Sequence, residues 1–229
     1  MLVLVLVGFA GSAFALDKAE LDNRIRTLTA KLEAMQGKPD KSIPADKLRQ
    51  ARGIILLDRT KAGFLFAYEG GSGVALVKDA KTGQWSAPAF VDAFDASLGF
   101  QAGGQQSFDA ILLMDDYSTR LLTESDVRFG GEARGTAGES SAGVEGKVST
   151  PERSVQVYDD RNGLYGGVDI AGGAISPDEA ADRAYYEQVV STKDILFDKK
   201  VKPTPAALAL AAKLNDYSKP AGFSQNARP

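Results

Sequence analysis

Histidine and cysteine are both absent from this chain of 229 residues. Without histidine, the Ser-His-Asp and Cys-His arrangements that activate a nucleophile cannot be built in their usual form. Without cysteine, disulfides, thiolate chemistry, iron–sulfur clusters and the common zinc sites are excluded as well. Acid–base chemistry is therefore left to Asp, Glu, Lys and Tyr, and only an all-oxygen Mg²⁺ or Ca²⁺ site would fit the remaining side chains.

The chain also has little excess charge of either sign. Its 27 Lys and Arg against 30 Asp and Glu give a net charge of −3, so no global basic field exists to hold a nucleic acid. Any anionic partner must therefore be bound by a local cluster of basic residues. The 44% hydrophobic and 25% charged residues are ordinary for a globular domain, and the 24 glycines weigh against a helical bundle.

Residues 1–15 read MLVLVLVGFAGSAFA and carry no charge. The run is too short for a good transmembrane helix, which needs about 20 apolar residues. It ends in Ala13-Phe14-Ala15, the A-x-A form of a secretory cleavage site. We therefore predict a signal peptide at 1–15 and a mature chain that begins near Leu16. No Lys or Arg opens the run, so the true start codon could lie upstream, and an ordinary buried strand is the alternative.

Helices are predicted at both ends of the mature chain. Leu21, Ile25, Leu28, Leu32 and Met35 recur in steps of four and three, which predicts one amphipathic helix within residues 16–42. This helix packs on its own domain in the simplest interpretation, and a short coiled coil is the alternative. Further helices are expected over 44–52, 116–125 and 192–197, and after the capping residues Ser176 and Thr204.

Strands are predicted between these helices, separated by Gly- and Asp-rich turns. The run 108–114 is continuously apolar, as expected of a central strand buried on both faces. Segregated runs of helices and strands indicate an α+β fold, here an antiparallel β-sheet sandwich or barrel-like core flanked by N- and C-terminal helices. We expect a single domain over 43–218 and a disordered tail at 219–229. Strands are expected at 54–57, 64–68, 74–78, 89–93, 98–102, 108–114, 154–158 and 164–170, turns at 69–73, 79–83 and 159–163, and strands or an ordered glycine loop over 127–148.

Three motifs that could carry chemistry are better explained as turns and caps. The glycine run at 69–74 lacks the Lys-Ser or Lys-Thr of a phosphate-binding loop, so a tight hairpin is favoured. The pairs Asp115-Asp116 and Asp159-Asp160 could serve a carboxylate-based hydrolase, but adjacent strand residues point to opposite faces. The run 159–163 lacks the later Glu of an EF-hand loop, which leaves at most a weak Ca²⁺ contact.

Basic residues gather in the first third of the chain. Lys47 and Arg49 lie near Arg52, Arg59 and Lys61, and a predicted hairpin adds Lys78 and Lys81. Each Lys or Arg near an anionic bilayer is worth about 1 kcal/mol, so a few convergent ones would give useful affinity. We predict a lipid-binding patch made of Arg52, Arg59, Lys61, Lys78 and Lys81, and a surface with scattered charges is the alternative.

Several segments of residues 43–198 resemble the SYLF domain, also called the Ysc84 actin-binding or DUF500 domain. The resemblance lies in Ile43-Pro44, 48–57, 62–64, 70–74, 85–90, 99–103, 109–114, 163–168 and Tyr185-Tyr186, and the segments WSAPAF and GLYGGV are its most specific parts. The chain departs from the family pattern in having few Lys and Arg in its second half, and Phe94-Asp95-Ala96-Ser97 where small residues are common.

This resemblance implies lipid binding, phosphoinositide binding among eukaryotic members, and actin bundling in some fungal members. Bacterial relatives often carry export signals. For an exported bacterial protein, we expect a peripheral membrane protein of the periplasm or exterior that binds anionic phospholipid. Actin is not expected as a partner, nor is nucleic acid, and no cofactor or catalytic residue is implied. The chain is therefore expected not to be an enzyme, and a structural or protein-binding role in the envelope is the alternative function.

Overall fold

A computed structural model of the chain describes residues 17–63, 67–97, 103–125, 127, 154–160 and 174–220. The predicted signal peptide, the tail beyond 220, and the strands expected at 98–102 and 164–170 lie outside these residues. So does the glycine-rich stretch from 128 to 148.

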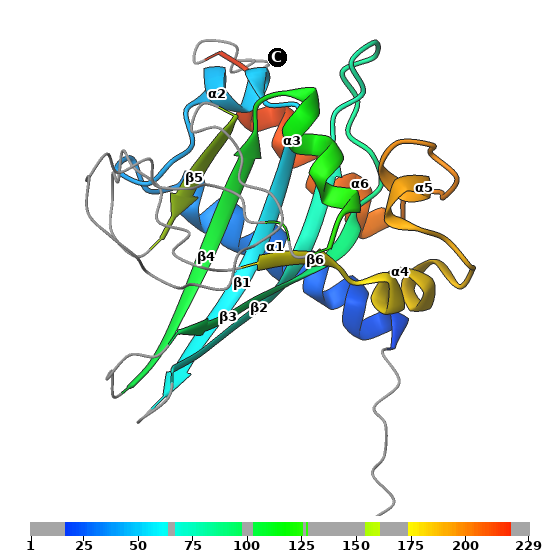
Figure 1. The fold of residues 1–229 in the computed structure, drawn as a ribbon. Helices are drawn as coiled ribbons and strands as arrows, with labels where there is room; N and C mark the ends of the chain where they lie inside the picture. Colours follow the sequence, from blue (N-terminus) through cyan, green and yellow to red (C-terminus); the bar gives the residue numbers. More distant parts are fainter. Residues whose placement is uncertain are drawn as a thin grey trace, which may run out of the picture.

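A six-stranded antiparallel sheet forms the centre of the molecule (Figure 1). Its strand order is β5-β4-β1-β2-β3-β6, so β5 and β6 are the edges and, among the described strands, the sheet does not close into a barrel. The predicted α+β class is confirmed. The strands are β1 (Gly53–Gly63), β2 (Ala67–Val77), β3 (Ala89–Ser97), β4 (Gly103–Leu113), β5 (Val155–Asp159) and β6 (Ala174–Pro177).

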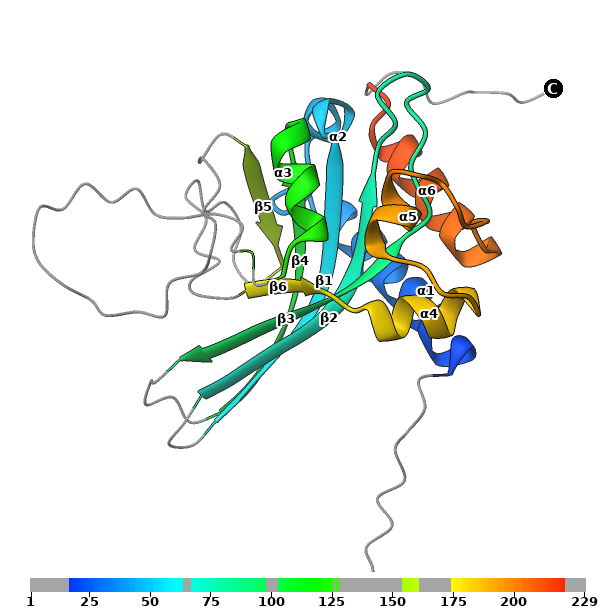
Figure 2. The same ribbon diagram turned by 45° about the vertical axis from the view of Figure 1, so that its right-hand side comes forward.

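Helices pack against both faces of the sheet and bury two apolar clusters (Figure 2). One cluster lies on each face of the sheet. The first face carries α1 (Lys18–Gln36), α2 (Ala45–Gln50), α4 (Glu179–Tyr186) and α6 (Pro205–Tyr217), and the second carries η1 (Leu121–Thr123), which follows α3 (Asp116–Arg120), and α5 (Thr192–Leu196).

The alternation of side chains along β4 shows why a continuous apolar run is needed there. Ala110 and Leu112 face the first cluster, whereas Ile111 and Leu113 face the second. Side chains alternate between faces along a strand, so a strand covered on both sides must be apolar at every position. The prediction of a central strand buried on both faces is confirmed.

Helix α1 packs on its own domain, as the simplest interpretation of its sequence requires. Its apolar positions are at most 1% exposed and belong to the same cluster as the sheet and α6. None of the helices in the described ranges is long and apolar enough to cross a membrane.

Local capping signals correctly predicted the start of α6 but not that of α4. Thr204 caps α6 by accepting a hydrogen bond from Ala207 N, as predicted. The start predicted at Ser176 was wrong, because β6 continues through Pro177 and Asp178 caps α4 by accepting from Ala181 N. Pairing of Ser176 with Asp92 of β3 outweighs the local helix signal.

The turn predicted at 69–73 was also wrong, because these residues lie inside β2. A Cβ atom on Gly73 would lie 2.0 Å from Leu56 O, so no side chain fits at this crossing of β1 and β2. A glycine inside a strand often marks such a close approach of two backbones. The glycines of this run therefore allow β1 and β2 to pack closely. Neither a hairpin turn nor a phosphate-binding loop is formed by these residues.

Candidate functional site

Three of the five cations predicted to bind lipid lie at one end of the sheet. Arg52 precedes β1, and Lys78 and Lys81 follow β2, which is its neighbour. Backbone hydrogen bonds hold these segments together, since Arg52 N donates to Leu113 O and Lys78 N donates to Arg52 O. We call this region the basic end, defined by Lys47, Arg49, Arg52, Lys78, Lys81, Arg120 and Lys199.

Arg59 is not part of the basic end. It is 5% exposed and forms an ion pair with Asp109, with 3.3 Å between Arg59 Nη1 and Asp109 Oδ2. A Cβ on Gly71 would lie 2.8 Å from Arg59 Cγ, so the missing side chain of Gly71 makes room for the arginine stem. The structure thus places Arg59 in the interior, where a membrane surface cannot reach it. The side chain of Lys61 lies outside the described residues.

Lys78 is at the basic end but is already engaged. Its Nζ donates hydrogen bonds to Leu48 O and Arg49 O at 2.8 and 3.1 Å, and it lies 4.6 Å from the centre of the Trp85 ring. Burial, together with the charge of Arg52, lowers the pKa of Lys78. Because its ammonium satisfies carbonyls at the end of α2, Lys78 holds the helix in place and adds little free charge to the surface.

The turn at 79–83 presents Lys81 to solvent, as the sequence predicted. Asp79 Oδ1 accepts hydrogen bonds from Lys81 N and Thr82 N, each at 2.8 Å, and Gly83 supplies the positive φ of +70°. The other oxygen of Asp79 forms an ion pair with Lys199. The hydrogen bond from Lys199 and those from the backbone hold the pKa of Asp79 well below its usual range. The ion pair between Asp79 and Lys199 therefore joins this turn to the segment between α5 and α6.

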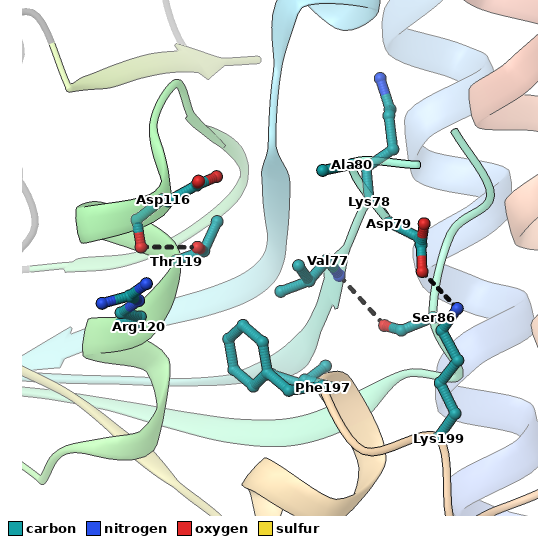
Figure 3. Close-up of a pocket in the computed structure, with 11 residues that line it drawn as sticks. Val77, Lys78, Asp79, Ala80, Ser86, Asp116, Thr119, Arg120, Phe197 and Lys199 are labelled. Carbon is teal, nitrogen blue, oxygen red and sulfur yellow. Dashed lines mark hydrogen bonds and ion pairs between the residues drawn. The ribbon is translucent and has the colours of Figure 1, made fainter. Parts of the chain in front are cut away.

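A pocket of about 250 Å³ opens at the basic end between α3, this turn and α5 (Figure 3). Arg120 lines it on the α3 side and Lys199 on the α5 side, while Val77 and Phe197 supply apolar surface. In Figure 3 the Phe197 ring reaches from α5 toward α3. The pocket thus combines cations with an apolar wall, a lining that suits a small amphiphilic anion.

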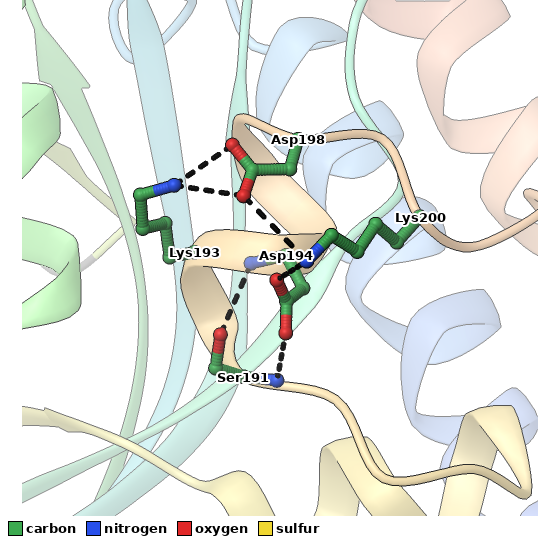
Figure 4. Close-up of polar contacts among 5 residues, drawn as sticks. All are labelled: Ser191, Lys193, Asp194, Asp198 and Lys200. Atoms are coloured by element: carbon green, nitrogen blue, oxygen red, sulfur yellow. Dashed lines mark hydrogen bonds and ion pairs between the residues drawn. The ribbon is translucent and has the colours of Figure 1, made fainter.

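A network of ion pairs fixes the wall of this pocket (Figure 4). Ser191 and Asp194 form a capping box at the start of α5, and Asp194 also accepts from Lys200 Nζ at 2.6 Å. Lys193 pairs with Asp198 at 2.7 Å. The Lys200 hydrogen bond, followed by those from Ser191, lowers the pKa of Asp194 to about 2. Since all five residues lie within 191–200, the network folds this segment on itself and presents Phe197 and Lys199 to the pocket.

Two of the four adjacent carboxylates, Asp115 and Asp160, accept hydrogen bonds from the backbone of the fold. Asp115 caps α3 by accepting from Ser118 N at 2.7 Å, which confirms the capping interpretation. Asp160 Oδ1 accepts from Phe108 N at 3.0 Å, and Asp159 is the last residue of β5. Among the described residues, no group of three or more acidic side chains is arranged to hold a metal ion.

Sequence reasoning missed Arg120, Phe197 and Lys199. No local motif marks them, because they come from α3 and from the segment after α5, far from Lys81 in the chain. Only the pairing of Lys199 with Asp79 and the packing of α5 on the sheet bring them to the basic end.

Comparisons with known proteins place the chain among its relatives. The family model Ysc84, described as "Las17-binding protein actin regulator", matches residues 94–217. The SH3 domain-containing YSC84-like protein 1 of Homo sapiens is 31% identical over 170 residues, which cover 73% of this chain and 49% of that protein. The chain belongs to the Ysc84 family.

Other relatives show the same partial coverage of longer proteins. The Bos taurus SH3 domain-containing YSC84-like protein 1 is also 31% identical, over 73% of this chain and 50% of its own length. LAS seventeen-binding protein 3 of Saccharomyces cerevisiae is 31% identical over 171 residues, which cover 37% of that protein. This Ysc84-family chain thus spans about half or less of the relatives it matches. No solved structure matches it.

Proposed function

We propose that this Ysc84-family domain binds the surface of anionic phospholipid membranes through its basic end. The observation that supports the proposal is the gathering of exposed cations from α2, the turn at 79–83, α3 and the α5–α6 segment in a chain whose net charge is negative. A local cluster of this kind attracts anionic head groups even though the whole molecule does not.

The cations of the basic end differ in how free they are. Lys81 is exposed and Lys47 is partly exposed, and neither has a charged partner among the described residues. Arg49 donates only to the backbone oxygen of Ser218, at 3.4 Å. Arg52 lies 3.9 Å from Asp116 with 44% of its side chain exposed, so this contact is weak. These four residues therefore replace the predicted set that included the buried Arg59.

The proposed role is binding, with no catalytic step and no cofactor. The uncharged run at 1–15 supports export of the chain, and we propose a peripheral membrane location in the bacterial envelope. In that location the available anionic surface is that of acidic phospholipid, while inositol lipids are not expected.

Co-sedimentation with vesicles tests the proposal. The mature chain should bind vesicles that contain phosphatidylglycerol and not neutral vesicles, and binding should weaken as salt rises. The double variant Lys47→Gln/Lys81→Gln should bind about thirtyfold more weakly, because two cations worth about 1 kcal/mol each are lost.

A matched control uses two exposed cations of α1, which is not part of the basic end. Lys18 pairs with Glu187 at the end of α4, and Arg26 pairs with Asp22 on its own helix. The variant Lys18→Gln/Arg26→Gln has the same net charge as Lys47→Gln/Lys81→Gln and should bind as the unaltered chain does. Equal losses in both variants, or binding to neutral vesicles, would overturn the assignment of the basic end.

A protein partner is the second candidate function. The observation in its favour is the description of the matching family as an actin regulator and the name of the yeast relative as a Las17-binding protein. These descriptions give no support to the expectation that actin is not a partner. Co-sedimentation of the chain with filamentous actin separates the two functions, since a lipid module should stay in the supernatant with actin and pellet with anionic vesicles.

A further inference from the structure

The pocket at the basic end is lined by a cation from each of two segments, Arg120 of α3 and Lys199 of the segment after α5. We propose that it binds the phosphate group of a single phospholipid head group, held between Arg120 and Lys199, with the adjoining carbon atoms packed against Phe197 (Figure 3). This inference rests on the proposed function and adds to it a defined subsite, so that one lipid molecule is captured in addition to the general attraction of the surface.

The charges that line the pocket leave a positive excess for this ligand. Three cations, Lys78, Arg120 and Lys199, line the pocket together with two acids, Asp79 and Asp116. Asp79 is paired with Lys199, and the contact of Asp116 with Arg52 is weak. Arg120 is exposed and has no charged partner in the part of the chain that the structure describes. Its guanidinium can donate two parallel hydrogen bonds to phosphate oxygens, a geometry that an ammonium cannot provide.

Lys199 can take part without breaking its contact with the turn. An ammonium has three hydrogen-bond donors, and the contact with Asp79 uses one of them. Lys199 also has φ of +53°, in the left-handed region, which a residue with a side chain rarely adopts. The ion-pair network of 191–200 holds the backbone of this segment, and Asp79 holds the ammonium of Lys199 at the edge of the pocket before a ligand arrives.

The apolar wall gives the pocket a preference for a lipid over free phosphate. Val77 is the last residue of β2, Leu196 is the last residue of α5, and Phe197 caps α5 by donating its backbone N–H to Lys193 O. Phe197 is partly exposed and can cover the glycerol carbons of a head group. Inorganic phosphate would contact the cations but not the apolar wall, so it should bind more weakly.

Titration with a soluble lipid separates this subsite from surface attraction. The probe is dihexanoyl phosphatidylglycerol below its micelle concentration, followed by calorimetry and by backbone amide NMR shifts. We expect saturable binding with shifts centred on Arg120 and Phe197, and at least tenfold weaker binding of inorganic phosphate and of glycerol 3-phosphate. Equal binding of free phosphate would overturn the lipid part of the proposal.

Variants of pocket residues complete the test. Arg120→Gln should weaken binding of the soluble lipid about tenfold or more, and Phe197→Leu should weaken it less because it keeps an apolar side chain. Arg49→Gln removes a cation of the basic end outside the pocket and should change this binding less than twofold. If the chain binds anionic vesicles but not the soluble lipid, the subsite is overturned while the proposed function stands. Loss of both would overturn both.

Discussion

Two regions of this molecule use charged side chains in opposite ways. In the interior, Arg59 and Asp109 are 5% and 3% exposed and pair with each other between β1 and β4. At the basic end, Lys47 and Lys81 reach solvent without a charged partner among the described residues. The difference follows from the free energy of removing an ion from water. A buried ion needs a partner of opposite charge, whereas an exposed ion stays hydrated and can bind a ligand.

This contrast separates charges that hold the fold from charges that are available for binding. Both kinds lie within one short stretch of sequence, since Arg52 and Arg59 belong to the same strand region. Nearness in sequence therefore says little about shared function, and variants of the two kinds should give different readouts.

The largest effect is expected from breaking the buried pair. Arg59→Ala should lower the free energy of unfolding by about 3–5 kcal/mol, because Asp109 would be left in the interior without this cation. Denaturant unfolding measures the loss. Binding of the folded protein to anionic vesicles should change less than twofold. The double variant Arg59→Met/Asp109→Leu should recover much of the stability, and a selective loss of vesicle binding in Arg59→Ala would contradict the division into two regions.

A second interior charge should make stability depend on pH. Asp182 is 0% exposed, and its oxygens accept from Phe90 N at 2.8 Å and Thr192 Oγ1 at 3.3 Å. Burial raises the pKa of Asp182 to about 7 against the opposing effect of the hydrogen bonds from Phe90 and Thr192, and the charges of Asp178 and Glu179 add a smaller increase. The folded state thus retains this proton between about pH 4 and pH 7, where the unfolded state releases it.

Because the folded state binds more protons in this window, the contribution of Asp182 to stability falls as pH rises. Asp182→Asn can keep both hydrogen bonds, so its stability relative to the unaltered chain should increase from pH 4 to pH 7 by on the order of 3 kcal/mol. Urea unfolding at several pH values measures this difference. A difference that stays constant with pH would show that Asp182 is ionised in the folded protein throughout.

The smallest effect is expected from an exposed ion pair. Arg183 and Glu179 lie one turn apart on α4 at 3.0 Å, with about half of each side chain exposed. Arg183→Gln should change the free energy of unfolding by about 0.3–0.5 kcal/mol, because solvent screens such pairs. The same unfolding measurement serves as the check, and a loss comparable to that of Arg59→Ala would remove the distinction between interior and surface charges.

Periodicity and capping chemistry predicted much of the fold. The apolar steps of α1, the caps of α3 and α6, and the turn at 79–83 depend on residues close in sequence, and each appears where it was expected. The errors came where a distant strand decides the outcome. Ser176 joins β6 because β3 pairs with it, and the glycines at 70–73 lie in β2 because β1 passes too close for side chains.

The candidate site was only partly predictable for the same reason. Lys81 could be placed on an exposed turn from Asp79 and Gly83 alone. The burial of Arg59 depends on Asp109, which comes from another strand, and Arg120 and Phe197 reach the pocket through α3 and α5. Sequence patterns predict side-chain type and local geometry. They do not predict which residues from distant parts of the chain will surround a given charge.

The sequence by itself determined the absence of histidine and cysteine chemistry, the α+β class, and the resemblance to the Ysc84 family that comparison confirmed. Tertiary structure alone decided which cations are buried and which are exposed, and which segments meet to form a pocket. The physical reason is that the environment of a charge depends on long-range packing, which sets its solvation and its partners.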